Sequence, residues 1–218
     1  MRKKPLTLSV VAVVAVVLLA AVVVWIFPVI RVNSIEVSGA ERVSAETVLA
    51  DSGIAEGDNL LRIDASGAAS RIAKQPWVRG VTVSRHFPST VDIAVTEREV
   101  VGFVEHDDGA HLIDHQGHAF LIDTPPDEAV EITGEVEDEA AVNAAVAAIA
   151  TVSDPIRREI ASLEVKSSHA MELRLHDGRT IYWGVDDANE QKAAALEHVI
   201  HREGQHWDIS NPSLVTVR

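Results

Sequence analysis

The chain opens with one long apolar run, and after it apolar residues either alternate with polar ones or recur at helical spacing. The run covers 25 residues, 6–30, without a charged side chain. At about 1.5 Å of rise per residue, a helix of that length exceeds the roughly 30 Å hydrocarbon core of a bilayer. We therefore expect residues 6–30 to form a single transmembrane helix in contact with lipid, preceded by a short segment, residues 1–5.

The charges around this run predict its orientation. Arg2, Lys3 and Lys4 precede it, and the first acidic residue is Glu36. Basic residues beside a span stay on the cytoplasmic side, so residues 1–5 are expected inside and the rest of the chain outside, as a single-pass type II protein of the cell membrane. A cleaved signal peptide is the alternative, but its apolar region is shorter and ends at a small-residue site that is missing before Arg31.

Residues 31–98 alternate in a way that predicts a strand, two helices and a hairpin. A short alternating strand at residues 35–38 comes first. Ser44 and Asp64 are candidate N-caps of two helices with apolar faces. The alternating runs 81–84 and 91–96 then predict an antiparallel hairpin that covers those faces. The expected element order is β-α-α-β-β.

Residues 99–218 predict a second, mixed α+β domain with an antiparallel-rich sheet. One helix has an apolar face that ends before Asp154-Pro155, and a second helix is expected to begin at a capping box, Asp187-Ala188-Asn189-Glu190. The tight turn Asp177-Gly178 joins two of the strands. The expected strands are residues 100–104, 163–165, 171–175, 180–183 and 214–217, with a hairpin over residues 111–120. The fold class is thus α+β throughout the part beyond the span.

Charge excludes nucleic acid as a partner. Residues 32–98 hold 7 basic and 9 acidic side chains, whereas residues 99–218 hold 8 and 24. Binding to the phosphates of a nucleic acid requires clustered Lys and Arg, which the acidic segment 99–218 lacks. The chain has no Cys, so neither disulfides nor thiol chemistry are available to it.

The histidines are the best candidates for metal chemistry. Four of them, His106, His111, His115 and His118, fall within 13 positions of one another. A zinc site needs three or four converging ligands, but alternate residues of a hairpin point to opposite faces. We therefore expect surface histidines and no metal site or cofactor.

Known catalytic patterns are also missing from the sequence. There is no G-x-S-x-G turn and no glycine-rich phosphate loop, so the chain is not expected to be an enzyme. Two other classes of function stay open: an extracytoplasmic sensor of metal or pH that uses the histidines, and a membrane-anchored cell-wall enzyme.

Several motifs resemble one known family. They are the hairpin string Phe87-Pro88-Ser89-Thr90-Val91-Asp92-Ile93-Ala94-Val95-Thr96-Glu97-Arg98, and the shorter strings Gly57-Asp58-Asn59-Leu60-Leu61, Pro76-Trp77-Val78 and Leu112-Ile113-Asp114-His115-Gln116-Gly117. Their order resembles the bacterial division proteins of the FtsQ family, called DivIB in many Gram-positives. The order β-α-α-β-β outside a membrane anchor likewise resembles a POTRA domain. The resemblance implies a POTRA domain over 31–98 and an FtsQ-type beta domain over 99–218.

The resemblance also implies a function. FtsQ-like proteins are non-enzymatic scaffolds at the division septum, where they recruit and regulate septal cell-wall synthesis. Expected partners are two small bitopic proteins, one FtsB-like (DivIC in Gram-positives) and one FtsL-like, together with the septal transglycosylase and transpeptidase pair.

The resemblance finally places partner contacts in the last strand and the turn before it. An edge strand leaves N–H and C=O groups unpaired, and a partner strand can pair with them. Nothing in the sequence follows residues 214–217 to cover that edge, apart from Arg218. Arg179, after the Asp177-Gly178 turn, is a weaker candidate. The expected contacts are Ser210, Asn211, Leu214, Val215, Thr216 and Val217.

Overall fold

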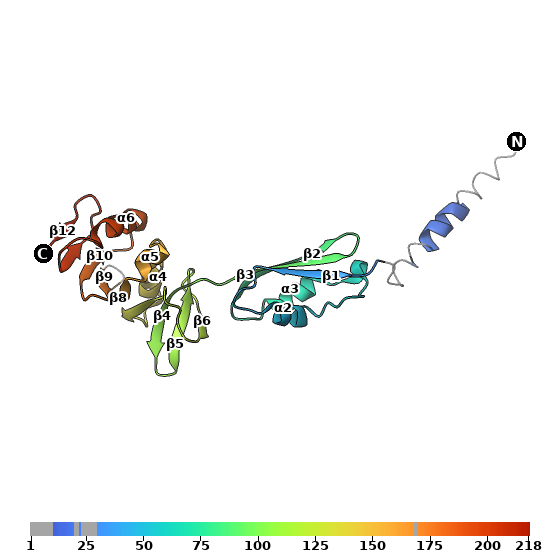
Figure 1. Cartoon of the computed structure of the whole chain (residues 1–218), viewed down its shortest axis with the longest axis horizontal. Helices are drawn as coiled ribbons and strands as arrows, with labels where there is room; N and C mark the ends of the chain where they lie inside the picture. The colour runs from blue at the N-terminus through green and yellow to red at the C-terminus, as the bar shows by residue number, and fades with distance from the viewer. Residues whose placement is uncertain (1–10, 20–21, 23–29, 168–169) are drawn as a thin grey trace. The chain divides into compact units, whose positions relative to one another are not determined.

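The computed structural model describes residues 11–19, 22, 30–167 and 170–218 (Figure 1). Residues 11–19 and 22 are helical. The predicted N-terminal segment 1–5 and most of the predicted span 6–30 lie outside the described residues. Within the described part, no helix combines the length and the apolar character that a membrane crossing needs.

The chain forms two compact units, Met1–Glu97 and Arg98–Arg218, which we call unit 1 and unit 2. We expected the boundary after Arg98, and the units divide one residue earlier. Each unit is described on its own below.

Between residues 30 and 97, unit 1 has the predicted order β-α-α-β-β. In its sheet β3 is central, parallel to β1 and antiparallel to β2, and α2 and α3 lie together on one side of this sheet (Figure 1). Its elements are β1 (Ser34–Ser38), α2 (Ala45–Ser52), the 3-10 helix η1 (Leu60–Arg62), α3 (Ala65–Ile72), β2 (Val78–His86) and β3 (Thr90–Glu97).

Both helices of unit 1 begin at the caps that the sequence indicates. The Ser44 side chain accepts a hydrogen bond from the backbone N–H of Thr47 (3.1 Å), and Asp64 accepts one from Gly67 (2.9 Å). Gly53 ends α2 in the left-handed region at φ 63°, where a residue without Cβ is favoured.

The core of unit 1 follows from the alternation along β3. Val91, Ile93 and Val95 are buried on the helix side of the sheet, against Val48 of α2 and Ile72 of α3. Burial of each such aliphatic side chain contributes roughly 1.5–3 kcal/mol to folding. Asp92 and Ala94, which alternate with them, face away from the helices.

Unit 2 is built on one nine-stranded sheet with the order β12-β11-β10-β9-β8-β7-β4-β5-β6. Five of its eight strand pairs are antiparallel and three are parallel. The described strands at its two edges are β12 and β6. The elements are β4 (Val100–His106), β5 (Gly109–Asp114), β6 (Ala119–Ile122), β7 (Val130–Gly134), α4 (Glu139–Ile149), α5 (Asp154–Arg157), β8 (Ile160–Ser167), β9 (Ala170–Leu175), β10 (Thr180–Gly184), α6 (Asn189–Val199), β11 (His206–Asp208) and β12 (Thr216–Val217).

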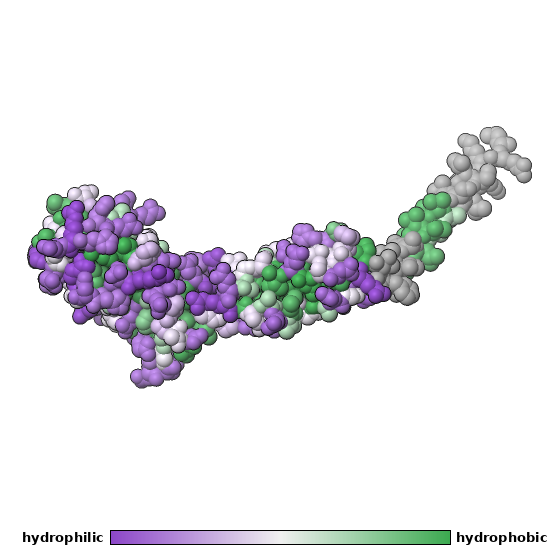
Figure 2. Space-filling view, viewed as in Figure 1, coloured by the Kyte–Doolittle hydropathy of each residue, from purple (hydrophilic) through white to green (hydrophobic). Residues whose placement is uncertain are grey.

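The core of unit 2 lies between its sheet and its helices. Helix α4 packs against β4, β7, β8 and α6. Trp183 of β10 is fully buried, and its indole N–H donates to the side chain of Asn189 at the start of α6 (3.0 Å). Leu163 and Leu196 are also fully buried. The visible surface of unit 2 is mostly hydrophilic (Figure 2), in line with its acidic composition.

One expectation for unit 2 is corrected, and two of its strands were missed. The predicted capping box at the start of α6 is wrong, because the N-cap residue Ala188 is left-handed (φ 48°) and makes no side-chain cap. Asp187 instead accepts a hydrogen bond from the buried Lys192 amino group (2.6 Å), which also donates to the carbonyl of Val185. Strands β7 and β11 were not predicted.

Candidate partner-binding edge

Strand β12 forms one edge of the unit 2 sheet. It pairs antiparallel with β11, with Val217 opposite Trp207 and Thr216 opposite Asp208. Arg218 and His206 exchange two backbone hydrogen bonds (2.9 and 3.3 Å). In an antiparallel ladder such hydrogen-bonded pairs alternate with non-hydrogen-bonded ones, so the N–H and C=O of Val217 point away from β11. Within the described residues no strand pairs with this outer side.

The strand is shorter than predicted. We expected a strand over residues 214–217, and only Thr216 and Val217 form it. The preceding segment is held in turns instead: the Asn211 side chain accepts from the N–H of Ser213 (3.1 Å), and the Asn211 carbonyl accepts from Leu214 (2.9 Å). These local bonds delay the start of the extended backbone.

The residues of this edge leave apolar surface exposed. Leu214 is 67% exposed and Val217 is 49% exposed, whereas Val215 packs against the core. Asp208 holds the loop between β11 and β12, because its carboxylate accepts hydrogen bonds from both the N–H (3.0 Å) and the hydroxyl (2.6 Å) of Ser210. The structure therefore gathers six of the seven predicted contact residues at one end of the sheet.

An apolar groove of about 570 Å³ lies beside the edge on the side of α6. Trp207 lies at this groove, and its indole N–H has no hydrogen-bond partner among the described residues. The groove is lined by Gln191, Ala194, Ala195, His198, Val199, Arg202, Trp207, Pro212, Ser213 and Val215. A side chain from a strand added to β12 would find apolar surface here.

The opposite face of the same edge is polar. A second hollow of about 430 Å³ lies there, with Glu172, Tyr182 and Asp208 among its lining residues. A hydrogen bond from the Lys166 amino group lowers the pKa of Glu172, so that this carboxylate stays charged at neutral pH. The edge thus has an apolar face and a polar face that carries both acidic and basic side chains.

Arg179 lies apart from the loop before β12. Its guanidinium donates to Asp177 (2.7 Å) and to the carbonyl of Arg202 (3.1 Å). The backbone N–H of Arg179 and then its side chain lower the pKa of Asp177. Arg179 precedes Thr180, which is opposite His206 in the sheet, and His206 in turn pairs with Arg218. It is therefore near the C-terminal end of β12, two strands away.

The histidines of the β4–β5 hairpin converge more than we expected. The rings of His106 and His111 have centroids 4.4 Å apart, and His111 Nε2 is 2.9 Å from the carboxylate of Asp108. The hydrogen bond from His111 lowers the pKa of Asp108. Across the described ranges, no three His, Asp or Glu side chains are placed so that they could hold a metal ion.

Asp114 is a residue whose role the sequence did not indicate. It is fully buried, and its carboxylate accepts from the N–H groups of Gln116 (2.9 Å) and His118 (3.1 Å) and pairs with Arg98. Burial alone would raise the pKa of Asp114, but these hydrogen bonds and the guanidinium hold it below its usual value. The carboxylate stabilises the β5–β6 turn, which is a structural role.

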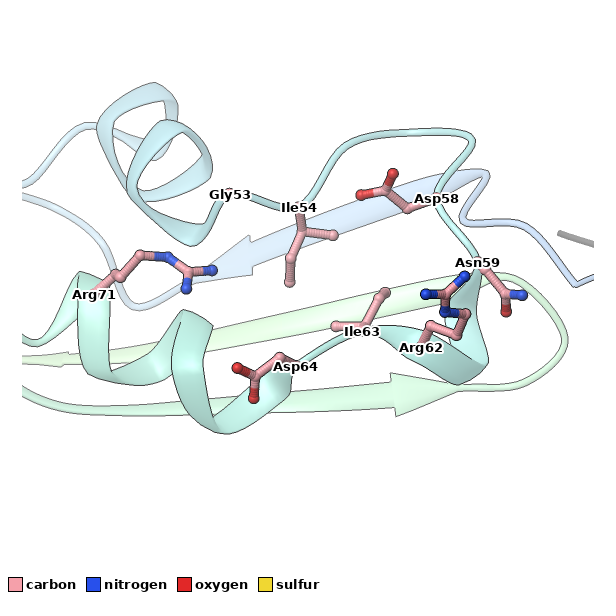
Figure 3. A pocket seen from close by; sticks show the side chains of 8 residues that line it. All are labelled: Gly53, Ile54, Asp58, Asn59, Arg62, Ile63, Asp64 and Arg71. Atoms are coloured by element: carbon pink, nitrogen blue, oxygen red, sulfur yellow. The ribbon is translucent and has the colours of Figure 1, made fainter. Parts of the chain in front are cut away.

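A hollow of about 360 Å³ in unit 1 is shown in Figure 3. Three of its polar side chains bond to the backbone: Arg71 donates to the carbonyls of Asp51 and Ser52, Asp58 accepts from the N–H of Ala55, and Asp64 caps α3. These bonds hold the loops between the helices.

Comparison with known proteins agrees with this architecture. Residues 30–98 match the family described as "POTRA domain, FtsQ-type", and residues 102–213 match "Cell division protein FtsQ/DivIB, C-terminal". A POTRA domain of this type followed by this C-terminal domain places the chain in a class of bacterial cell division proteins. The chain belongs to the FtsQ/DivIB family of cell division proteins, as its motifs predicted.

Individual relatives support the same assignment. The chain is 42% identical to the cell division protein FtsQ of Corynebacterium glutamicum over all of both chains. It is 31% identical to FtsQ of Mycobacteroides abscessus, over 90% of this chain and 64% of that protein. Against FtsQ of Mycolicibacterium smegmatis it is 30% identical, over 88% of this chain and 58% of that protein.

One solved structure is also similar. It is the major extracytoplasmic domain of the trans isomer of the cell division protein DivIB from Geobacillus stearothermophilus. The similarity covers 48% of this chain and 89% of that chain, with 15% sequence identity and a TM-score of 0.39.

Proposed function

We propose that this protein is a non-enzymatic scaffold of the divisome whose β12 edge binds a small bitopic division protein of the FtsB/DivIC kind. The observation that carries the proposal is the open outer side of β12, flanked by the exposed side chains of Leu214 and Val217. A partner strand would pair with the backbone of Val217 and place alternate side chains on the apolar and polar faces of the edge.

The proposal includes anchoring in the cell membrane at the septum. Residues 6–30 would span the bilayer with residues 1–5 in the cytoplasm, and both units would lie outside. In that position the scaffold holds its FtsB/DivIC-like and FtsL-like partners beside the septal transglycosylase and transpeptidase pair. Support comes from the uncharged 25-residue run and from the family's role in cell division.

The decisive experiment replaces Val217 with proline. Proline removes the outward N–H of Val217 and leaves the bonds that Arg218 makes with β11. Edge strands tolerate proline on their open side, so unit 2 should stay folded. Loss of one backbone hydrogen bond of about 1–1.5 kcal/mol should weaken binding of the co-expressed FtsB/DivIC-like protein about 10-fold. The measurements are affinity by calorimetry and thermal melting of the same sample.

The matched control is Val217→Ile, which keeps the outward N–H and an apolar, β-branched side chain at the same position. It should bind like the parent protein. Deletion of Ser213 to Arg218 should abolish binding while unit 1 keeps its fold. If Val217→Pro binds as tightly as the parent at an unchanged melting temperature, the edge is not the binding site.

A further inference from the structure

One end of unit 1 holds the chain that follows the apolar run. The backbone N–H of Leu60 donates to the carbonyl of Ile30 (2.9 Å), and that of Asn33 donates to the carbonyl of Ser89 (2.8 Å). Asn33 is three residues beyond Ile30, a reach of at most about 11 Å. The β2–β3 turn is therefore within a short distance of the end of the run. We call this end, made of Arg31, Asn59–Arg62 and Arg85–Ser89, the proximal tip.

The proximal tip exposes an aromatic ring. Phe87, in the β2–β3 turn, is 63% exposed. Among residues 30–97 it is the one large apolar side chain that is largely exposed. Single exposed apolar side chains are common on protein surfaces, but a phenylalanine beside a bilayer can enter the boundary between headgroups and acyl chains.

The proximal tip also carries three arginines. Arg31, Arg62 and Arg85 are exposed, and Arg85 reaches across to donate to the carbonyl of Leu61 (3.2 Å). Figure 3 shows Arg62 beside Asn59, at the end of the hollow opposite Arg71. Guanidinium groups pair with phosphate oxygens, and their apolar stems can lie on a bilayer while the charge stays at the headgroups.

Carboxylates at the same end balance these charges. Glu56 and Asp58 belong to the neighbouring turn, and Asp92 faces His86 (4.0 Å). Three arginines against three carboxylates give no net attraction to an anionic surface, so the apolar contact must lead. A contact of this kind would depend only weakly on salt, in contrast to one driven by net charge.

We propose that the proximal tip docks on the phospholipid bilayer, with Phe87 in the headgroup–acyl boundary and the arginines on lipid phosphates. The inference rests on the membrane anchoring proposed above, because the anchor places the tip within reach of the lipid. Docking would fix unit 1 against the membrane surface in addition to its covalent tether.

The absence of Cys from the chain allows a direct test with single spin labels. The full-length protein is reconstituted in vesicles of phosphatidylethanolamine and phosphatidylglycerol, with a nitroxide on His86→Cys. Thr82→Cys is the matched control, since it is exposed on the same face of β2 and about 13 Å further along the strand. Collisions with lipid-soluble oxygen and a water-soluble nickel chelate measure label depth.

We expect the label at position 86 at a depth of about 5–10 Å and the label at position 82 in water. Phe87→Ser should move the first label into water, and Phe87→Leu should restore its depth, with circular dichroism spectra unchanged. The depth should persist in high salt. A water-exposed label at position 86, or no response to Phe87→Ser, overturns the docking.

Alkaline carbonate extraction separates this failure from a failure of the anchor. A protein that stays in the vesicles while the label at position 86 is in water refutes the docking alone. A protein that carbonate removes refutes the membrane anchor and the docking with it.

Discussion

At the residue scale, the buried carboxylate of Asp114 is important for the stability of unit 2. It is fully buried, and three donors hold it: the N–H groups of Gln116 and His118, and the Arg98 guanidinium. Charge-assisted hydrogen bonds contribute about 1.5–3 kcal/mol each to stability, and removing one partner leaves the other charge partly desolvated. Asp114 thus ties the first residue of unit 2 to the turn between β5 and β6.

Replacement of Asp114 by asparagine should therefore destabilise unit 2 by about 2–4 kcal/mol. The amide keeps one acceptor oxygen but leaves Arg98 without a counter-charge. Urea unfolding of the region beyond residue 30 measures the loss. Asp127→Asn, a change of the same chemistry at an exposed residue, is the control and should be within about 0.5 kcal/mol of the parent.

The role of Asp114 also predicts how the stability of unit 2 depends on pH. The pKa of Asp114 is lowered in the folded state, so the unfolded chain binds the proton more tightly. Its stabilising contribution is complete above the ordinary pKa of about 3.9 and is lost as the pH falls through the folded-state pKa. Between pH 7 and pH 3 the parent should lose more unfolding free energy than Asp114→Asn. Parallel curves for the two proteins would contradict this role.

At the element scale, local patterns predicted some strands well and others not at all. The alternation of Val91, Ile93 and Val95 predicted β3, because one face of that strand is covered by helices and the other faces water. Strand β7 carries only Val130 and Ile132 as buried apolar residues, between acidic loops, and was missed. Its strand character comes from parallel pairing with β4 and β8, distant contacts that no short window contains.

The candidate edge was predictable in position but not in form. The β propensity of Leu214 to Val217 indicated a last strand, but the side chain of Asn211 draws the preceding residues into turns and shortens it. The two faces of the edge were beyond prediction, since Glu172 and Trp207 reach it from β9 and β11 through the pairing order of the sheet. Likewise, the salt bridge to Lys192 overrode the capping role expected of Asp187.

Residues 32–98 should fold as an independent domain, because β3 and the helices bury one another's apolar faces. Replacing Ile93, which is fully buried, with Asp should lower the free energy of unfolding of this domain by several kcal/mol, because a charge would enter the core. Thr96→Asp, at an exposed site on the same strand, should be tolerated. Amide NMR spectra of the isolated segment and its variants provide the test. Collapsed spectra for the parent segment would refute its independence.

At the scale of the whole molecule, the two residues at the boundary between the units, Glu97 and Arg98, are each bound within their own unit. The carboxylate of Glu97 accepts from the N–H groups of Glu41, Arg42 and Val43 in unit 1 (2.9–3.0 Å), and Arg98 pairs with Asp114 in unit 2. Each unit therefore fixes its own side of the Glu97–Arg98 peptide bond.

The proposed topology across the membrane can be checked with two single-cysteine variants in the Cys-free chain. A membrane-impermeant thiol reagent applied to intact cells should label Asp108→Cys, an exposed residue of unit 2, and should miss Lys4→Cys. The reason is the positive charge of residues 2–4, which would keep that end in the cytoplasm of an anchored protein. Labelling of the second variant alone would reverse the orientation.

The open side of β12 also affects how readily the purified protein associates with itself. An unpaired edge invites a second copy of the same domain, and such pairing grows into aggregates when nothing opposes it. Residues 99–218 carry 24 acidic and 8 basic side chains, so two copies repel one another at neutral pH. The repulsion weakens when salt screens it or when carboxylates become protonated near pH 4. Purified protein should therefore be monodisperse in neutral buffers of low ionic strength and should self-associate in acid, with sedimentation velocity as the measure.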